Sequence, residues 1–422
     1  MSDFFSLLSS QIDPGVIRTI YLFLITFSPV ILVIILFIIF WPLWINYVRS
    51  EAIFKKKTVL LEIKLPKETI KSPMAMELFI TSLSQWAGEG NAFDRIWGGG
   101  TRPWYSLEMV SIEGQVRFYI WTRADQKNFV QSSLYAQFPG IEVAEAEDYA
   151  KSVHFDPKET KIWTATMKLL NPDPYPIKTY VDYGLDKDPK EEYKVDPLAP
   201  LIEYLGGVGY NQQVWIQILV RSHRVEQKGF LLTFSKEDKW KDQARAEVNK
   251  ILLRDPKTKV AGAKDEATGF TKLPSISKGE QDIVEALERS ITKMAFDVGI
   301  RVMYIAKKEF FDASNKGGIL GSFKQFGSEH LNTIIPDAKK HHPKMNYPWQ
   351  DYNSFRYNRI SKLALEAYKR RAYFYEPYVE KYFVLNSEEL ATIFHFPGQV
   401  AAAPTLYRVP SKKGQAPSNL PI

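Results

Sequence analysis

The chain has 422 residues, of which 45% are hydrophobic and 24% charged, and its formal net charge at pH 7 is +7. It contains no cysteine, which excludes disulfide frameworks, cysteine-based zinc sites and thiol nucleophiles. A mildly basic chain permits contact with nucleic acid or anionic lipid without requiring either. Its length favours more than one domain.

The first predicted element is a membrane-spanning helix over residues 19–48, a run without one charged residue. About 20 apolar residues suffice to cross the hydrocarbon core of a bilayer, and Trp41, Trp44 and Tyr47 would form an interfacial belt at one end. A cleaved secretory signal is the alternative, but the apolar run is longer than the core of such a signal. We therefore predict an N-terminal membrane anchor over residues 1–50.

The charges that flank this span predict its orientation, because lysine and arginine are retained on the cytoplasmic side. Arg18 is the one basic residue before the span, whereas Arg49, Lys55, Lys56 and Lys57 follow it. These four side chains are our candidates for contact with lipid headgroups at the membrane surface. We expect a single-pass protein of the cytoplasmic membrane, with its N-terminus outside and its C-terminal body in the cytoplasm.

Alternating apolar residues and helix-start signals then predict two tandem modules of the ferredoxin-like βαββαβ type. The first module covers residues 57–150, and the second covers residues 158–306 with a charged insertion at about 223–276. Ser277 and Glu280 predict a capping box for the helix that follows this insertion. In the first module we expect strands at 58–65, 104–112, 115–121 and 141–144, and helices that begin at Ser72 and near Asp125.

Beyond the second module the sequence predicts helices followed by a tail. Residues 307–397 are rich in aromatic residues and expected to be helical, and residues 398–422 form a proline-rich, extended tail. Asn386 and Glu389 predict a second capping box. The predicted fold class is therefore α+β, with an N-terminal transmembrane helix, two tandem ferredoxin-like modules and a helical C-terminal part.

The residues that could carry chemistry form no recognisable catalytic motif. The six histidines lack the spacing of zinc motifs. Neither glycine run, at 98–100 or 317–321, has the setting of a phosphate-binding loop, and the sequence holds no Walker motif. We therefore expect no catalytic residue, no metal, no cofactor and no enzymatic activity, although a site assembled only in three dimensions escapes such motifs.

Basic residues and tyrosines alternate in a segment near the C-terminus. Such residues can follow a phosphate backbone and stack bases, which makes this segment a candidate contact for nucleic acid. A solvated helix face with half-buried tyrosines explains the same pattern, and we favour that interpretation. The candidate residues are Arg356, Arg359, Lys362, Lys369, Arg370 and Arg371.

Residues 385–397 read LNSEELATIFHFP, in which Leu390, Ile393 and Phe394 would form one apolar helix face. These three residues are our candidates for docking a partner. Together with residues 209–220 and 296–306, this segment resembles the non-motor N-terminal region of membrane-anchored, type IV secretion-like DNA-transfer (conjugative) proteins of the FtsK/HerA kind.

This resemblance implies a scaffold whose partner is an ATPase. In fused relatives a Walker-bearing motor follows the equivalent region, whereas this sequence ends at Ile422, so the motor would be a separate chain. Our first hypothesis is a membrane scaffold that docks a DNA-translocating or secretion ATPase and has no chemistry of its own. A membrane-tethered nucleic-acid-binding protein is the alternative, and a second copy of the chain is left open as a further partner.

Overall fold

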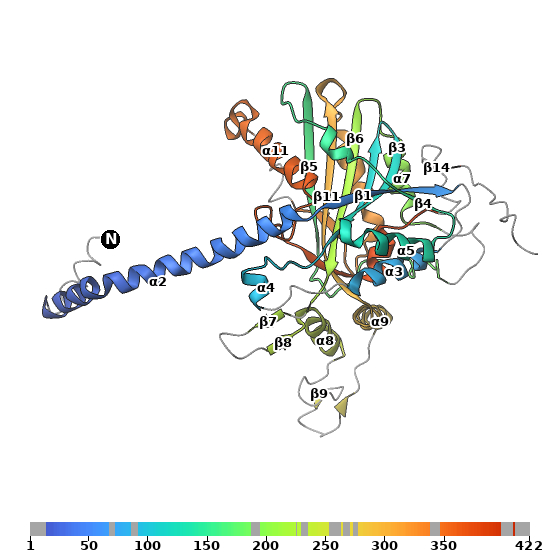
Figure 1. Ribbon diagram of the computed structural model, residues 1–422. Coiled ribbons are helices and arrows are strands. Elements are labelled where there is room, and N and C mark those ends of the chain that lie inside the picture. Colours follow the sequence, from blue (N-terminus) through green and yellow to red (C-terminus); the bar gives the residue numbers. More distant parts are fainter. Residues whose placement is uncertain are drawn as a thin grey trace, which may run out of the picture. The chain divides into compact units, whose positions relative to one another are not determined.

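The computed structural model (Figure 1) describes residues 14–66, 72–85, 92–186, 195–224, 226–228, 235–252, 263–264, 271–272, 277–337, 347–397 and 408–409. The chain divides into two compact units. The smaller unit comprises Met1–Lys55 and Glu89–Thr101, and the larger unit comprises Lys56–Gly88 and Arg102–Ile422. The predicted anchor thus falls in the smaller unit, together with a segment that we had placed in the first module.

The smaller unit is built around one long helix, α2 (Pro14–Lys55). Its segment Ile25–Lys55 has a mean hydropathy of 2.6 over its most apolar window, and none of that window is buried inside the protein. A helix with apolar side chains exposed on all sides is unfavourable in water and suited to a bilayer. The expected N-terminal apolar helix is therefore present, and it fits either a single membrane span or a signal sequence.

A glycine-containing loop packs against α2 within this unit. The loop follows the short helix α4 (Ala92–Ile96). Gly99 has a φ of +61°, in a region that residues with a Cβ atom disfavour. A Cβ atom there would lie 2.6 Å from the backbone oxygen of Val48 on α2. The glycine run at 98–100 therefore allows a close approach between two backbones, a structural reason for its composition.

The larger unit is built on a ten-stranded sheet, whose strands follow the order β12-β5-β11-β6-β2-β3-β1-β14, with β4 beside β1 and β13 beside β11. All of these pairs are antiparallel except β1 with β14. The strands are β1 (Thr58–Pro66), β2 (Tyr105–Ile112), β3 (Gln115–Arg123), β4 (Glu142–Glu145), β5 (Thr160–Leu169), β6 (Gln212–Ser222), β11 (Ala295–Lys307), β12 (Ile334–Pro336), β13 (Phe383–Asn386) and β14 (Arg408–Val409).

Helices of the larger unit connect and cover these strands (Figure 1). The α-helices are α3 (Pro73–Ser82), α5 (Lys127–Gln137), α6 (Tyr149–Ser152), α7 (Ala199–Gly206), α8 (Lys239–Ile251), α9 (Lys278–Thr292), α10 (Ser314–Ser322), α11 (Phe355–Lys369) and α12 (Ser387–Ile393). Short 3-10 turns are η1 (Leu83–Gln85), η2 (Ala124–Gln126), η4 (Lys308–Phe310), η5 (Lys324–Phe326), η6 (Pro348–Gln350) and η7 (Tyr352–Ser354). Two small hairpins, β7 (Glu226–Lys228) with β8 (Ser235–Glu237) and β9 (Ala263–Lys264) with β10 (Thr271–Lys272), lie in the predicted insertion.

One face of the sheet packs against helices to form the hydrophobic core. Successive residues of a strand point to opposite faces, so Leu107 and Met109 of β2 point toward the same layer as Ile216 and Ile218 of β6. Helices α3, α5, α7 and α12 contribute buried residues to this core. The apolar half of the predicted alternation is therefore the half that these helices cover.

The opposite face of the sheet carries polar and aromatic residues that are nevertheless buried. Glu108, Trp215 and Gln217 are each 0% exposed. Tyr149 of α6 and Tyr368 of α11 contact them, through hydrogen bonds and a ring contact. A second, polar layer therefore lies between the sheet and the C-terminal region, and the sequence analysis did not predict it.

The first half of the larger unit contains the predicted elements. β1, α3, β2, β3, α5 and β4 follow one another along the chain, and their strands pair in the order β4-β1-β3-β2. Ser72 caps α3 as expected, because its hydroxyl accepts from the backbone N–H of Met74 at 3.3 Å. The sequence patterns that predicted this half are local, because each cap or alternating run determines the structure of residues close to it in the chain.

The second half carries β5, α7, β6, α8, α9, β11, α10 and β12, and its strands pair in the order β12-β5-β11-β6. It joins the first half through antiparallel pairing of β6 with β2. The predicted insertion contains α8, and the capping box that we predicted from Ser277 and Glu280 is present at the start of α9. The strand that we expected to end this module, β11, lies in the middle of the sheet.

Residues 307–397 differ from the helical region that we predicted. They contain α10, α11 and α12, but also β12 and β13, which join the sheet. A strand of three or four residues is too short for its periodicity to reveal it in the sequence. The predicted tail, residues 398–422, lies outside the described residues except for β14.

Candidate functional site

The predicted contacts with lipid headgroups lie at the end of α2 and just after it. Lys55, Lys56 and Lys57 are exposed, and Arg49 is half-buried. Lys55 forms an ion pair with Glu51 at 2.6 Å on the same helix. Since Lys56 and Lys57 alone separate α2 from β1, three adjacent cations mark the point at which the apolar helix gives way to the sheet.

Helix α11 positions most of the predicted contacts for nucleic acid. Asp351 fixes its start, because the carboxylate accepts from the backbone N–H groups of Arg356 at 2.8 Å and Tyr357 at 2.9 Å. The side chains of Arg356, Arg359, Lys362 and Arg370 are exposed, and Lys369 is half-buried. Four of the six predicted cations thus lie on the surface of one helix and the turn that follows it.

Arg371, the sixth predicted cation, is a correction to the sequence analysis. Its side chain is 1% exposed and lies over the sheet, with Nε 3.0 Å from Glu108 Oε1 and Nη1 2.5 Å from Asp148 Oδ2. Burial would lower the pKa of Arg371, but the Glu108 carboxylate and Asp148 raise it above its ordinary value. The guanidinium compensates buried carboxylates and cannot also contact a phosphate backbone.

Glu108 is the centre of the polar layer between the sheet and α11. Besides Arg371, it accepts hydrogen bonds from Ser106 Oγ at 2.6 Å, Gln217 Nε2 at 3.0 Å and Tyr149 Oη at 2.8 Å. Arg301 extends the layer, since its guanidinium donates to Gln217 at 3.2 Å. All of these groups are paired, as buried polar groups must be to avoid a large desolvation cost.

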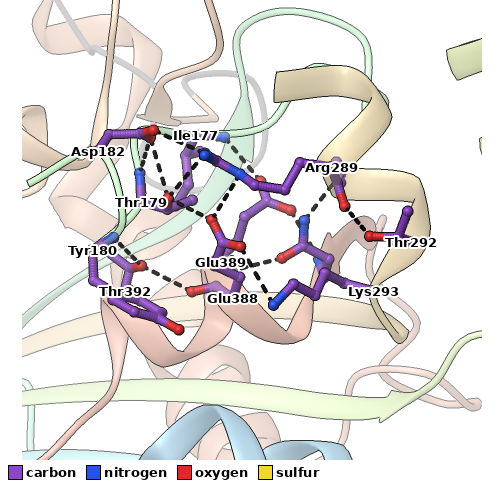
Figure 2. Close-up of polar contacts among 12 residues, drawn as sticks. Ile177, Thr179, Tyr180, Asp182, Arg289, Thr292, Lys293, Glu388, Glu389 and Thr392 are labelled. Carbon is purple, nitrogen blue, oxygen red and sulfur yellow. Dashed lines mark hydrogen bonds and ion pairs between the residues drawn. The ribbon is translucent and has the colours of Figure 1, made fainter. Parts of the chain in front are cut away.

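A second polar network surrounds α12 on the core side of the sheet (Figure 2). Glu388 accepts from Thr179 Oγ1 at 2.6 Å and pairs with Arg289 at 3.3 Å and Lys293 at 3.6 Å. These cations come from α9 and the residue that follows it. The network therefore joins α12 to α9 and to the loop that precedes α7.

Glu389 caps its own helix and a distant loop. Its carboxylate accepts from the backbone N–H of Asn386 at 2.8 Å, which completes the predicted capping box, and from that of Ile177 at 2.8 Å. Burial raises the pKa of Glu389 to about 8. A proton therefore resides on this group over much of the ordinary pH range, and the segment 385–397 is tied to the rest of the fold by buried groups.

The predicted docking residues are a second correction. Leu390 and Phe394 are 0% exposed and Ile393 is 1% exposed, and all three belong to the main hydrophobic core. The apolar face of α12 is turned toward α3 and the sheet. These residues stabilise the fold and present no surface to a partner.

His395 follows α12 and is also buried. Its Nδ1 donates to the carbonyl of Ala391 at 2.9 Å, near the end of α12, and Nε2 lies 3.1 Å from Asp196 Oδ1. Burial would lower the pKa of His395, but the Asp196 carboxylate raises it above its ordinary value. This pair is a buried, structural one that no short motif in the sequence reveals.

A third buried carboxylate, Asp297 on β11, was missed by the sequence analysis. It lies 2.6 Å from His223 Nδ1 and 2.8 Å from Arg221 Nε. Burial would raise the pKa of Asp297, but its hydrogen bond to His223 and the charge of Arg221 lower it. Arg221 and Asp297 stand opposite each other on paired strands, so the register of β6 against β11, which the sequence does not state, creates this cluster.

A cavity of about 610 Å³ opens beside the start of β1, and both polar and apolar residues line it. Asp148, one of its carboxylates, is already engaged by Arg371. Among the described residues, no group of three or more His, Cys, Asp or Glu side chains could hold a metal ion. The lining residues are Thr58, Val59, Leu60, Trp121, Glu145, Ala146, Glu147, Asp148, Lys151 and Ser152.

Comparison with known proteins gives one family. Residues 49–406 match the family described as "Domain of unknown function (DUF8128)". No curated protein matches the chain. The matched residues begin directly after the predicted span and include every strand of the ten-stranded sheet except β14.

Proposed function

The chain belongs to the DUF8128 family, and we propose that it is a single-pass membrane scaffold that docks a separate DNA-translocating or secretion ATPase at the cytoplasmic face of the membrane. The observation that carries this proposal is the apolar surface of α2, whose most apolar window is entirely unburied. Since Lys56 and Lys57 alone connect α2 to β1, an inserted α2 would hold the larger unit at the bilayer surface.

The proposed fold of the larger unit is two ferredoxin-like modules joined edge to edge. Two strand orders support this proposal, β4-β1-β3-β2 and β12-β5-β11-β6. In each set, numbered along the chain, the first strand lies between the third and the fourth, and the second strand lies at an edge. On this reading the second module runs to β12, and α8 and α9 form an insertion between β6 and β11.

The ATPase enters the proposal through the resemblance of three segments to FtsK/HerA-type DNA-transfer proteins. Residues 209–220 and 296–306 cover most of β6 and β11, and residues 385–397 cover the end of β13 and all of α12. These elements are neighbours, because β11 pairs with both β6 and β13. The resemblance is therefore concentrated in one block of the core, which supports a shared fold and leaves the docking surface to exposed residues elsewhere.

Membrane insertion and orientation can be measured together, because the chain has no cysteine. Single cysteines at exposed Ala136 on α5 and at Ile34 in α2 would be probed with a membrane-impermeant maleimide in intact and in lysed cells. We expect Ala136→Cys to react after lysis only, and Ile34→Cys to remain unreactive in both. Reaction of Ala136→Cys in intact cells would indicate the opposite orientation. Release of the chain by alkaline washing of membranes would refute the proposal that α2 is a membrane anchor.

ATPase docking is tested by purifying the full chain from its own cells in a mild detergent after cross-linking. We expect mass spectrometry to recover a Walker-containing ATPase. The matched control is a full chain with Ile34→Asp and Leu36→Asp in α2, which keeps the larger unit. We expect this variant to leave the membrane fraction and to recruit no ATPase to it. Repeated recovery of lipid enzymes or ribosomes alone would overturn the docking proposal while leaving the anchor intact.

A further inference from the structure

We propose that the N-terminal end of α11 and the turns before it form a second membrane contact, which binds anionic lipid headgroups on the same bilayer that holds α2. This surface, the aromatic–basic surface, consists of Trp349, Tyr352, Phe355, Arg356, Arg359 and Lys362. The inference rests on the proposed membrane anchoring by α2, and it names a lipid partner for residues that this proposal does not use.

The aromatic side chains of this surface are unusually exposed. Trp349 is 76% exposed, Tyr352 is 81% exposed and Phe355 is 69% exposed. A patch of large, exposed apolar side chains with polar groups at its rim marks a site of contact with a partner or a membrane. Tryptophan and tyrosine in particular prefer the depth of the lipid headgroups, where the ring is apolar and its polar atom meets water.

The charge of the surface is positive. Arg356, Arg359 and Lys362 are exposed on the first two turns of α11. Asp351 is the one acidic residue between positions 347 and 363, and its carboxylate accepts from the backbone N–H groups at the helix start. A helix with aromatic residues and cations on its exposed side matches the composition of interfacial helices that bind anionic lipid.

Nucleic acid would use the same cations but fits the observed placement less well. The sequence pattern offered six cations interleaved with tyrosines, whereas Arg371 is buried and Tyr368 and Tyr373 are 0% and 1% exposed. The most exposed rings of this segment, those of Trp349, Tyr352 and Phe355, lie on the turns before α11 and at its first residue, and Tyr347 beside them is 53% exposed. A DNA strand that lay along α11 would contact cations but, beyond the first residue of that helix, would find no exposed rings on which its bases could stack. A bilayer, in contrast, requires one patch of rings with cations around it.

A tethered surface needs little affinity to remain bound. Lys56 and Lys57 are the whole connection between α2 and β1. If α2 is inserted, no residue of the larger unit can therefore be farther from the bilayer surface than about the diameter of that unit. Tethering of this kind raises the effective concentration to about the millimolar range. Each basic residue near an anionic membrane contributes a factor of about five in binding. Three cations and three aromatic rings are therefore sufficient for persistent contact.

The test is made on the full chain reconstituted into vesicles. A fluorescent label is attached to a single cysteine at Tyr352→Cys, with Ala136→Cys on α5 as the matched exposed control and Ile34→Cys in α2 as the reporter of insertion. Lipid-borne quenchers then report contact in vesicles of phosphatidylcholine with phosphatidylglycerol, and in vesicles of phosphatidylcholine alone. We expect the label at position 352 to be quenched severalfold more than that at 136, chiefly in the anionic vesicles.

The charge-reversed chain Arg359→Glu with Lys362→Glu, labelled at position 352, should lose most of that quenching. Equal quenching at positions 352 and 136 in anionic vesicles, with position 34 fully quenched, would overturn this inference and leave the anchor standing. Absence of quenching at position 34 would overturn both. A response of the label at 352 to short duplex or single-stranded DNA, without a response to anionic lipid, would assign the surface to nucleic acid instead.

Discussion

Replacing Arg371 with methionine tests whether buried ion pairs hold the C-terminal region on the sheet. The guanidinium lies 3.0 Å from Glu108 and 2.5 Å from Asp148, and the Glu108 side chain is 0% exposed. Removing one partner of a buried ion pair costs about 3–5 kcal/mol in unfolding free energy, because the other charge stays buried without compensation. Arg371→Met is therefore expected to be among the most destabilising single changes in the larger unit.

The hydrogen bonds that Glu108 keeps after the substitution place the expected loss of unfolding free energy near the lower end of that range. Ser106, Gln217 and Tyr149 still donate to its carboxylate at 2.6, 3.0 and 2.8 Å. The side chain of Asp148 is 11% exposed, so water can replace part of what it loses. We expect a loss of about 3 kcal/mol for Arg371→Met. The double change Glu108→Gln with Arg371→Met removes the buried charge as well, and it should restore part of that loss.

Urea unfolding of the full chain in detergent micelles, followed by tryptophan fluorescence, gives the measurement. Arg370→Met is the matched control, because Arg370 is exposed and a surface substitution changes stability by about 0.5 kcal/mol or less. The reasoning fails if Arg371→Met unfolds at the same urea concentration as Arg370→Met. It fails equally if the double change is no more stable than Arg371→Met alone.

Three further predictions concern the segment 385–397. Burial raises the pKa of Glu389 to about 8, so its contribution to stability is complete below its ordinary pKa of 4.5 and is lost as the pH rises through about 8. The urea midpoint should fall over that window, and Glu389→Gln should flatten the fall; an unchanged slope would contradict the assignment. His395→Gln breaks the buried pair with Asp196 and should cost about 1–3 kcal/mol while leaving membrane insertion and ATPase recruitment nearly intact. Leu390→Asp places a charge in the core and should unfold the segment and weaken recruitment, so a stable His395→Gln chain that had lost recruitment would refute the structural role of His395.

The parts of the fold that the sequence predicted depend on signals between near neighbours. The apolar run of α2, the cap at Ser72 and the boxes at Ser277 with Glu280 and at Asn386 with Glu389 each act within a few residues. Alternation likewise revealed the long strands, because one face of each is covered by apolar helices. These features were predictable because the physical cause and its effect lie close together in the chain.

The features that the sequence could not predict depend on strand register and on distant partners. Arg371 reads as one more cation of a basic run, yet its partner Glu108 lies 263 residues away. His395 and Asp196 are separated by 199 residues. Buried and exposed arginines look the same in a periodic pattern, since the long side chain suits either environment when a carboxylate is near. The assignment of Arg371 to nucleic acid was wrong because its partners, Glu108 on β2 and Asp148 before α6, come close only when the turn after α11 packs over the sheet.

The distribution of buried and exposed groups limits the surfaces on which the proposed ATPase could dock. The segment with the most specific resemblance, 385–397, is tied into the core through Leu390 and Glu389, so substitutions within it should change recruitment only by changing the fold. Arg371 and His395 likewise join the C-terminal region to Glu108 on β2 and to Asp196 before α7. The ATPase that we propose as the partner would therefore recognise side chains outside these networks. Exposed residues that leave the unfolding free energy unchanged are consequently the ones in which a loss of recruitment would identify the docking surface.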